Sequence, residues 1–292
     1  MIVSRFAPAP TGYLHLGHVV NAIYVWGITR ARGGRVLLRI EDHDRQRCRP
    51  EFDAAILEDL KWLGFEFDAP LVRQSDRGAV YDRALDRLRA RGLVYACDCS
   101  RAKIAALSSL EGDELRYPGT CAHKELPEAP GLGLRVRLAP SVERFIDLRH
   151  GRQEQRPSEQ CGDLLARDRD GHWTYQFAAT VDDLEQEVTL VIRGDDLLPS
   201  TGRQIQLARM LGRSRPPLFL HHALIMKSAQ QKLSKSDRDT GVRELRAQGW
   251  TAADLIGQVA ARAGLIEKAR PIEAREAKAI IRLPPGGVSF GS

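Results

Sequence analysis

The chain has 292 residues, of which 28% are charged and 43% hydrophobic, a globular composition that excludes a low-complexity or collagen-like chain. Its net charge of +6 permits an anionic partner such as a nucleic acid, and its five cysteines, an odd number, favour metal ligands or free thiols over a disulfide framework. Arg5 and several prolines stand where a secretory signal would be apolar, and the apolar run at 19–29 is too short to span a bilayer, so we expect a cytoplasmic protein without a membrane partner.

Strand and helix signals alternate along the first hundred residues. The pattern predicts strands at 2–7, 35–40 and 93–96, a Pro- and Gly-rich loop at 8–12, and helices at 18–31, 52–63 and 79–91. A strand–loop–helix–strand beginning of this kind predicts an α/β fold with a Rossmann-like, doubly wound parallel sheet.

The pattern changes at residue 97, where cysteines, prolines and short strand-like runs begin. We expect residues 97–156 to form an insertion between two halves of the catalytic domain, at 1–96 and 157–215. Residues 216–292 carry a short strand, a Lys-rich loop and small C-terminal helices, and the Pro- and Gly-punctuated stretch at 268–292 predicts partial disorder.

A first motif, Leu-His15-Leu-Gly17-His18, lies where the first strand passes into the first helix. Unpaired N–H groups and the helix dipole favour phosphate there, and Gly17 lets a nucleotide approach the backbone. His15 and His18 are three positions apart, so both can face one side of the first turn. We therefore predict an ATP site formed by His15, Gly17 and His18.

A second motif, Lys232-Leu-Ser-Lys235-Ser, follows a hydrophobic strand. Alone it fits a solvated basic loop. Beside the histidine motif it supplies two ammonium groups that can stabilise charge on a departing pyrophosphate. We predict His15, His18, Lys232 and Lys235 as catalytic residues, with Lys235 also binding ATP.

These two motifs together resemble the hallmark motifs of the class I aminoacyl-tRNA synthetases. Further blocks, collinear to about residue 240, are similar to the glutamyl/glutaminyl branch: Arg-Phe-Ala-Pro-Ala-Pro-Thr-Gly at 5–12, Leu-Arg-Ile-Glu-Asp at 38–42, Val-Ile-Arg-Gly-Asp-Asp-Leu-Leu at 191–198 and Thr-Gly-Arg-Gln-Ile-Gln-Leu at 201–207. The resemblance implies a ligase that forms an aminoacyl adenylate from ATP, which enters with Mg²⁺.

The same resemblance implies a pocket for glutamate. Arg193 is expected near the side-chain carboxylate, Glu41 near the ammonium group and the Tyr175 hydroxyl nearby, although each of these residues taken singly also fits surface charge or core. The implied glutamate-binding set is Arg5, Phe6, Ala7, Pro8, Ala9, Glu41, Tyr175 and Arg193. Since guanidinium pairs well with carboxylate and poorly with an amide, we predict glutamate rather than glutamine.

Three cysteines, Cys97, Cys99 and Cys121, are spaced as metal ligands, whereas Cys48 and Cys161 read as ordinary thiols. General zinc chemistry favours His123 as the fourth ligand. Resemblance to short glutamyl-synthetase-like proteins that hold zinc with three cysteines and a tyrosine implies Tyr117 instead. We predict one structural Zn²⁺ on Cys97, Cys99, Tyr117 and Cys121; the alternative is a group of buried, reduced thiols without metal.

Only 56 residues follow Ser236, too few for an anticodon-reading domain of usual size. In this the chain resembles the glutamyl-queuosine tRNA(Asp) synthetases, a family similar to the catalytic half alone. That resemblance implies L-glutamate, ATP and queuosine-bearing tRNA(Asp) as partners, with transfer to queuosine in the anticodon loop, and we expect a monomer.

Three other functions stay open. The first is a truncated synthetase that charges the 3′ end of tRNA(Glu). The second is a non-catalytic tRNA-binding paralogue, which the presence of both histidines and both lysines disfavours. The third is a small-molecule nucleotidylyltransferase, which the blocks around Glu41 and Arg193 disfavour.

Overall fold

The computed structural model describes residues 1–44, 47–108, 115–228, 231–232 and 241–281. The strands are β1 (Val3–Phe6), β2 (Arg35–Ile40), β3 (Val72–Arg73), β4 (Val94–Cys97), β5 (Gly133–Val136), β6 (Glu143–Asp147), β7 (Gly151–Gln155), β8 (Leu164–Arg167), β9 (Leu190–Gly194), β10 (Leu218–His222), β11 (Met226–Ser228) and β12 (Gln231–Lys232). The α-helices are α1 (Leu16–Ala31), α2 (Pro50–Leu63), α3 (Gly78–Arg89), α4 (Arg101–Leu107), α5 (Pro157–Gln160), α6 (Tyr175–Glu185), α7 (Thr201–Met210), α8 (Val242–Ala247), α9 (Ala252–Arg262) and α10 (Ala277–Ile280).

Two groups of parallel strands meet at β1 and β9. The first group has the order β1-β2-β3, and the second has the order β9-β10-β6 with β7 antiparallel at its edge. The backbone N–H of Thr189, just before β9, donates to the Val3 carbonyl of β1 at 2.9 Å. The predicted α/β fold is confirmed, with a mixed sheet because of β7. The chain order reverses between β1 and β9, and ligands of such sheets bind beyond the carboxyl ends of the strands at this point.

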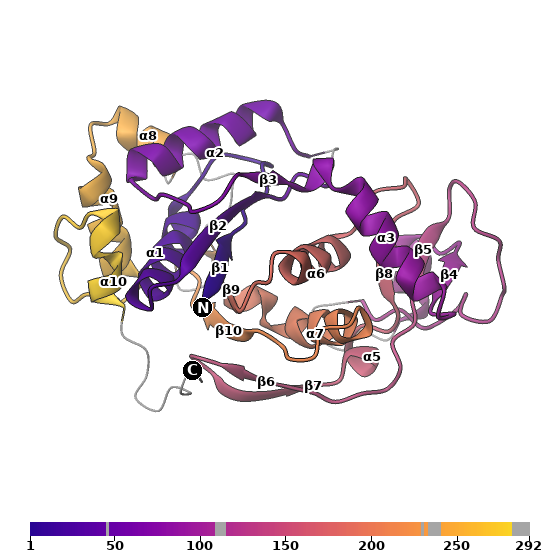
Figure 1. The fold of residues 1–292 in the computed structure, drawn as a ribbon. Coiled ribbons are helices and arrows are strands. Elements are labelled where there is room, and N and C mark those ends of the chain that lie inside the picture. The colour runs from indigo at the N-terminus through magenta and orange to yellow at the C-terminus, as the bar shows by residue number, and fades with distance from the viewer. Residues whose placement is uncertain (45–46, 109–114, 229–230, 233–240, 282–292) are drawn as a thin grey trace.

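Helices cover both faces of this sheet (Figure 1). Helix α1 is packed between the sheet and the C-terminal helices α9 and α10, so apolar residues lie nearly all around it. Gly27 permits the close approach of α10, because a Cβ there would lie 2.9 Å from the Ala277 carbonyl oxygen. Helices α6 and α7 lie on the opposite face, where α6 contributes side chains to the site described below.

Strand pairing divides the chain differently from the expected ranges. Strand β4, expected in the first half of the catalytic domain, pairs with β5 in a separate antiparallel sheet, β4-β5-β8. The β6–β7 hairpin, expected in the insertion, instead joins the main sheet beside β10. The reason is hydrophobic: Phe145 of β6 packs on Phe219 of β10, with ring centroids 5.3 Å apart. Strand β10, expected in the C-terminal region, likewise belongs to the main sheet.

Within the described part of the chain, no helix combines the length and apolar character needed to cross a membrane.

Candidate active site

The N-terminus of α1 is built around the two predicted histidines. His15 is the N-cap: its ring nitrogen Nδ1 accepts from the Gly17 N–H at 3.1 Å, and the His15 N–H donates to Nδ1 of His18 at 3.1 Å. The two rings lie together, with centroids 3.9 Å apart. A Cβ at position 17 would lie 2.9 Å from the His15 ring, so glycine is needed for this packing. The first turn carries no acidic residue, which suits an anionic ligand.

Residues on both sides of the Lys-rich motif lie against this turn. On the C-terminal side, Gly241 forms a bridge with His15, and the Val242 N–H donates to the Leu14 carbonyl at 2.9 Å. On the N-terminal side, the His222 ring stacks on Tyr24 of α1, with centroids 5.0 Å apart and planes 5° apart. The chain therefore leaves α1 at His222 and returns to it at Gly241.

The Lys-rich motif itself is described only in part. Lys232 lies in β12, whose backbone pairs with β11. Lys235 lies outside the described residues. The catalytic roles of both lysines therefore remain predictions from the sequence.

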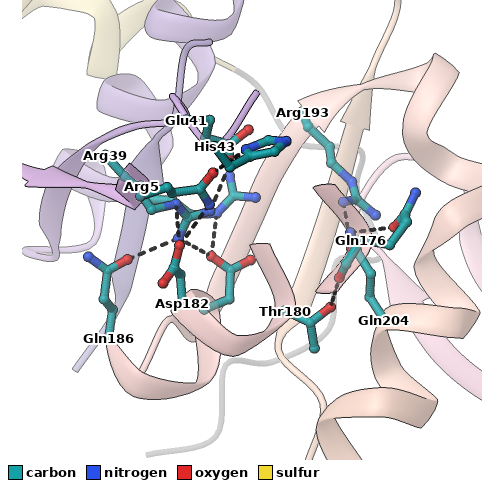
Figure 2. Close-up of polar contacts among 12 residues, drawn as sticks. Arg5, Arg39, Glu41, His43, Gln176, Thr180, Asp182, Gln186, Arg193 and Gln204 are labelled. Carbon is teal, nitrogen blue, oxygen red and sulfur yellow. Dashed lines mark hydrogen bonds and ion pairs between the residues drawn. The ribbon is translucent and has the colours of Figure 1, made fainter. Parts of the chain in front are cut away.

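Two arginines at the carboxyl ends of β1 and β2 share one carboxylate of α6. Arg5 Nε donates to Asp183 Oδ1 at 3.0 Å, and Arg39 Nη1 donates to the same oxygen at 2.7 Å. Arg39 Nη2 also donates to Glu41 at 3.0 Å. Burial alone would raise the pKa of Asp183, but the charges and hydrogen bonds of Arg5 and Arg39 lower it to about 2. This network, which we call the ion-pair cluster, is drawn in part in Figure 2.

Asp182 ties the ion-pair cluster to the elements around it. It lies 3.6 Å from Arg39 Nε and accepts hydrogen bonds from Gln74, Arg77 and the Tyr81 hydroxyl. Arg39 and Asp182 are completely buried. Burial alone would lower the pKa of Arg39, but the surrounding carboxylates, Asp183 first, raise it above its usual value. Thus the two carboxylates of α6 fix the positions of β1, β2 and α3 around the site.

Arg193, at the end of β9, has a different environment. Its three nitrogens donate to His221 Nε2 at 2.9 Å, Gln204 Oε1 at 2.7 Å and Thr201 Oγ1 at 2.8 Å. The side chain is only 4% exposed, and no carboxylate among the described residues forms an ion pair with it. Burial lowers the pKa of this guanidinium. In Figure 2 Arg193 points toward Gln176 and Gln204, apart from the ion-pair cluster.

Tyr175 lies close to both groups. Burial and then the charge of Glu41 raise the pKa of its hydroxyl, and the charges of Arg193 and Arg5 act in the opposite direction. The hydroxyl therefore stays protonated at neutral pH. His43 is the next ring, 6.4 Å from Tyr175 between centroids.

The segment after β1 contributes mainly backbone. The Phe6 side chain lies in the core against Trp26, with centroids 5.4 Å apart, so only its backbone can face a ligand. The Pro8 carbonyl accepts from the Glu41 N–H at 3.0 Å, and the Ala9 carbonyl accepts from the Thr11 N–H at 2.8 Å. These bonds hold the loop that contains Ala7 beside the end of β2.

The three predicted zinc ligands of the cysteine type come together in the insertion. The sulfur atoms of Cys97, Cys99 and Cys121 lie within 4.8 Å of one another, are buried and form no disulfide. The Tyr117 hydroxyl is 3.4 Å from Cys97 Sγ, whereas His123 is exposed and is not part of this group. Burial would raise the pKa of Cys97, but hydrogen bonds from Tyr117, the Cys99 backbone and Arg135 lower it. This donor set fits a zinc ion.

A cavity separates the cysteine group from α6. Its volume is about 630 Å³, and its lining includes Tyr117, Arg135, Tyr175, Gln176 and Arg203. The cavity therefore extends from the predicted zinc ligands to the predicted glutamate pocket.

Several residues of the site stand outside the set predicted from the sequence, among them Arg39, Asp182, Asp183, Thr201, Gln204 and His221, together with Asp147, whose Oδ2 lies 2.7 Å from His221 Nδ1. Arg39 could have been predicted from the sequence, because residues two apart on a strand share a face and Glu41 belongs to the predicted set. Asp183 and His221 each interrupt an apolar segment, which signals a buried polar group. Asp147 gave no signal, because its contact with His221 depends on the hairpin joining β10.

Comparisons with known proteins show the family of the chain. A family model described as tRNA synthetases class I (E and Q), catalytic domain, matches residues 1–276. A glutamyl-Q tRNA(Asp) synthetase of Rhodobacter capsulatus is 42% identical over 87% of this chain and 98% of that protein. Glutamate–tRNA ligase 1 of Acidithiobacillus ferrooxidans is 40% identical over 87% of this chain, which spans 55% of that protein.

Among solved structures, a glutamate tRNA ligase of Elizabethkingia meningosepticum, in complex with its amino acid, is 26% identical with a TM-score of 0.79. The alignment covers 99% of this chain and 67% of that one.

Proposed function

Because the chain belongs to the glutamyl and glutaminyl branch of the class I aminoacyl-tRNA synthetases, and is thus a ligase, we propose that it activates L-glutamate with ATP and transfers the glutamyl group to queuosine in the anticodon loop of tRNA(Asp). The observation that carries the glutamate part is Arg193. It is a buried guanidinium whose described partners are all neutral.

An anionic substrate group is what this environment lacks. A guanidinium has five N–H donors, and three of those of Arg193 have acceptors within hydrogen-bond distance among the described residues, with the neutral Tyr175 hydroxyl beside the guanidinium. The side-chain carboxylate of glutamate would accept from the others and supply the missing negative charge. In the proposal Glu41 meets the substrate ammonium, and Arg5, Tyr175 and the backbone at 6–9 complete the pocket.

The activation step needs no protein nucleophile, since the α-carboxylate of glutamate is itself the nucleophile. It attacks the α-phosphorus of Mg²⁺-bound ATP, the new bond forms from carboxylate oxygen to phosphorus, and pyrophosphate leaves. His15 and His18 at the N-terminus of α1 would hold the phosphates, with Lys232 and Lys235 stabilising the leaving group. Positioning and electrostatics then account for the catalysis.

In the transfer step, a hydroxyl of the acceptor attacks the glutamyl carbonyl, loses its proton, and AMP leaves. The cavity of about 630 Å³ that reaches Tyr175 and Gln176 offers room for an acceptor nucleoside beside the adenylate. The choice of queuosine is supported by the relatives whose names give that function, over most of their length and of this chain. The net charge of +6 suits an RNA partner.

We also propose that Cys97, Cys99, Cys121 and Tyr117 hold one zinc ion that shapes the insertion. Its role would be structural, because four protein ligands leave no open position. Metal analysis of the purified protein should find about one equivalent of zinc, and Cys97→Ser with Cys121→Ser should lose it. Less than half an equivalent in the wild-type protein would contradict this part of the proposal.

One experiment tests the function as a whole. Labelled glutamate and ATP are incubated with bulk tRNA that contains or lacks queuosine, and the labelled nucleoside is identified by mass analysis. We expect label only in the queuosine-containing tRNA, in the anticodon loop of tRNA(Asp). Label on the 3′ end of tRNA(Glu) would favour the truncated synthetase, and no adenylate formation in folded protein would favour a non-catalytic paralogue.

A further inference from the structure

Behind Arg193 lies a second layer of buried polar groups. His221 Nδ1 is 2.7 Å from Asp147 Oδ2, and His221 Nε2 is 2.9 Å from Arg193 Nε. The side chains of both His221 and Asp147 are completely buried. The order Asp147–His221–Arg193 therefore connects β6, β10 and β9 in a single row of hydrogen bonds.

The chemistry of arginine settles the protonation state of His221. Nε of a guanidinium carries a hydrogen and can only donate, so His221 Nε2 must accept. The imidazole proton must then be on Nδ1, where it is donated to Asp147. A doubly protonated ring would place N–H against N–H, and burial also lowers the pKa of His221. The ring is thus a neutral acceptor.

Asp147 is itself held rigidly. Its other oxygen, Oδ1, accepts from the backbone N–H groups of Arg149 and His150, each at 2.9 Å, in the turn after β6. The Asp147 carboxylate also accepts from the His221 backbone N–H at 3.1 Å. These bonds leave the carboxylate little freedom to rotate, so they fix the orientation of the imidazole as well.

The fixed imidazole in turn fixes the orientation of the Arg193 guanidinium. With Nε held by His221, Nη1 by Gln204 and Nη2 by Thr201, each terminal nitrogen keeps a second N–H beyond these three bonds, and the Tyr175 hydroxyl, which interacts with this guanidinium, lies beside them. Two donors on adjacent nitrogens match the two oxygens of a carboxylate, whereas the amide of glutamine has one oxygen and one N–H-bearing group. A guanidinium free to rotate would lose this fixed pair.

We propose that Asp147 and His221 are positioning residues that hold Arg193 so that its two remaining N–H groups bind the side-chain carboxylate of glutamate and discriminate against glutamine. The inference rests on the proposed function, in which Arg193 binds that carboxylate. To the proposed glutamate pocket the inference adds Asp147 and His221, which do not touch the substrate, and the hairpin turn that fixes them.

The test compares ATP–pyrophosphate exchange in the wild type and in Asp147→Asn, His221→Leu and His221→Gln. Asp147→Asn and His221→Leu should raise KM for glutamate about 10-fold, with kcat and KM for ATP within about 2-fold of wild type. They should also narrow the preference for glutamate over glutamine by a similar factor. His221→Gln, whose amide oxygen can accept from Arg193, should recover most of the loss.

Arg144→Gln is the matched control. Arg144 lies on the same strand as Asp147 but is exposed, and its ion-pair partner among the described residues is Glu154, so its loss should change neither KM. If Asp147→Asn does not fold, the comparison of His221→Leu with His221→Gln carries the test.

Two failures are distinguishable. The positioning role alone would be overturned if the wild type activates glutamate but the variants keep its KM for glutamate. The same holds if the variants lose kcat and stability alike. A folded wild type without glutamate-dependent exchange would overturn the proposed function and this inference with it.

Discussion

Arg39 and Arg193 are both buried guanidinium groups in the main sheet, but their charges are balanced in different ways. Arg39 is surrounded by Asp182, Asp183 and Glu41, whereas the described partners of Arg193 are neutral. A buried charge is tolerated when it is paired and hydrogen-bonded, and an unpaired one costs folding free energy. The comparison gives Arg39 a structural role and supports the proposal that Arg193 binds an anionic group of the substrate.

Arg39→Met should give the largest effect, on folding. It leaves three carboxylates without their shared cation, so we expect the free energy of unfolding at pH 7 to fall by about 3–5 kcal/mol. Chemical denaturation measures it, with Arg144→Met as the exposed control. A loss below about 1 kcal/mol would contradict the structural role of the ion-pair cluster.

The same denaturation experiment at acid pH gives a second test of the ion-pair cluster. The folded pKa of Asp183, about 2, lies below the ordinary value of 3.8, so wild-type stability from this group is present above pH 4 and is lost as the pH falls toward 2. In Arg39→Met the pKa of Asp183 rises, and this acid-dependent loss should shrink.

Arg193→Met should have the opposite effects, a large loss of activity and a small change in stability. We expect kcat/KM for glutamate in pyrophosphate exchange to fall about 100-fold, because the carboxylate loses a charge-assisted bidentate partner. The free energy of unfolding should stay within about 1.5 kcal/mol of wild type, because an uncompensated buried charge is removed together with its hydrogen bonds. Unchanged kcat/KM would show that Arg193 is not the carboxylate partner.

Asp59 extends the comparison to a buried anion. Neither of its carboxylate oxygens has a hydrogen-bond partner in the described part of the chain, and burial raises its pKa to about 6. Because the folded value exceeds the unfolded one, this group lowers stability as the pH rises from about 4 to about 6, and the cost is constant above that. Asp59→Asn should therefore gain about 3 kcal/mol of unfolding free energy relative to wild type between pH 4 and pH 8. A pH-independent difference would contradict the buried charge.

Thr201→Val should give the smallest effect. It removes the neutral acceptor of Arg193 Nη2, 2.8 Å away, and leaves the other two. We expect KM for glutamate to rise about 5-fold with kcat unchanged, corresponding to about 1 kcal/mol. An effect equal to that of Arg193→Met would mean that the threonine contacts the substrate itself.

The sequence predicted the beginning of the fold well, because its signals are local. The helix after the Pro-containing loop at 8–12 and the strand at 35–40 are where periodicity places them. The separation of β4 from the main sheet and the entry of β6 into it were not predictable in this way. Both depend on which distant strand a short apolar run pairs with. The packing of Phe145 on β10, which determines the pairing of β6, exists only in the folded protein.

For the site, motifs identified His15, His18, Arg5, Glu41, Tyr175 and Arg193, but not how their charges are balanced. Asp183 contacts Arg5, and Asp147 acts on Arg193 through His221, across long stretches of chain, so no spacing in the sequence links them. Candidate substrate-binding residues can thus be proposed from local patterns, whereas the residues that contact them from distant parts of the chain depend on tertiary packing.

The most direct test of the central claim is pyrophosphate exchange with glutamate and with glutamine, without tRNA, in the wild type and Arg193→Met. We expect exchange that depends on glutamate in the wild type, little with glutamine, and loss of the glutamate preference in a variant that still folds. Exchange that prefers glutamine, or a glutamate preference that survives the loss of Arg193, would contradict the claim that this guanidinium awaits the substrate carboxylate.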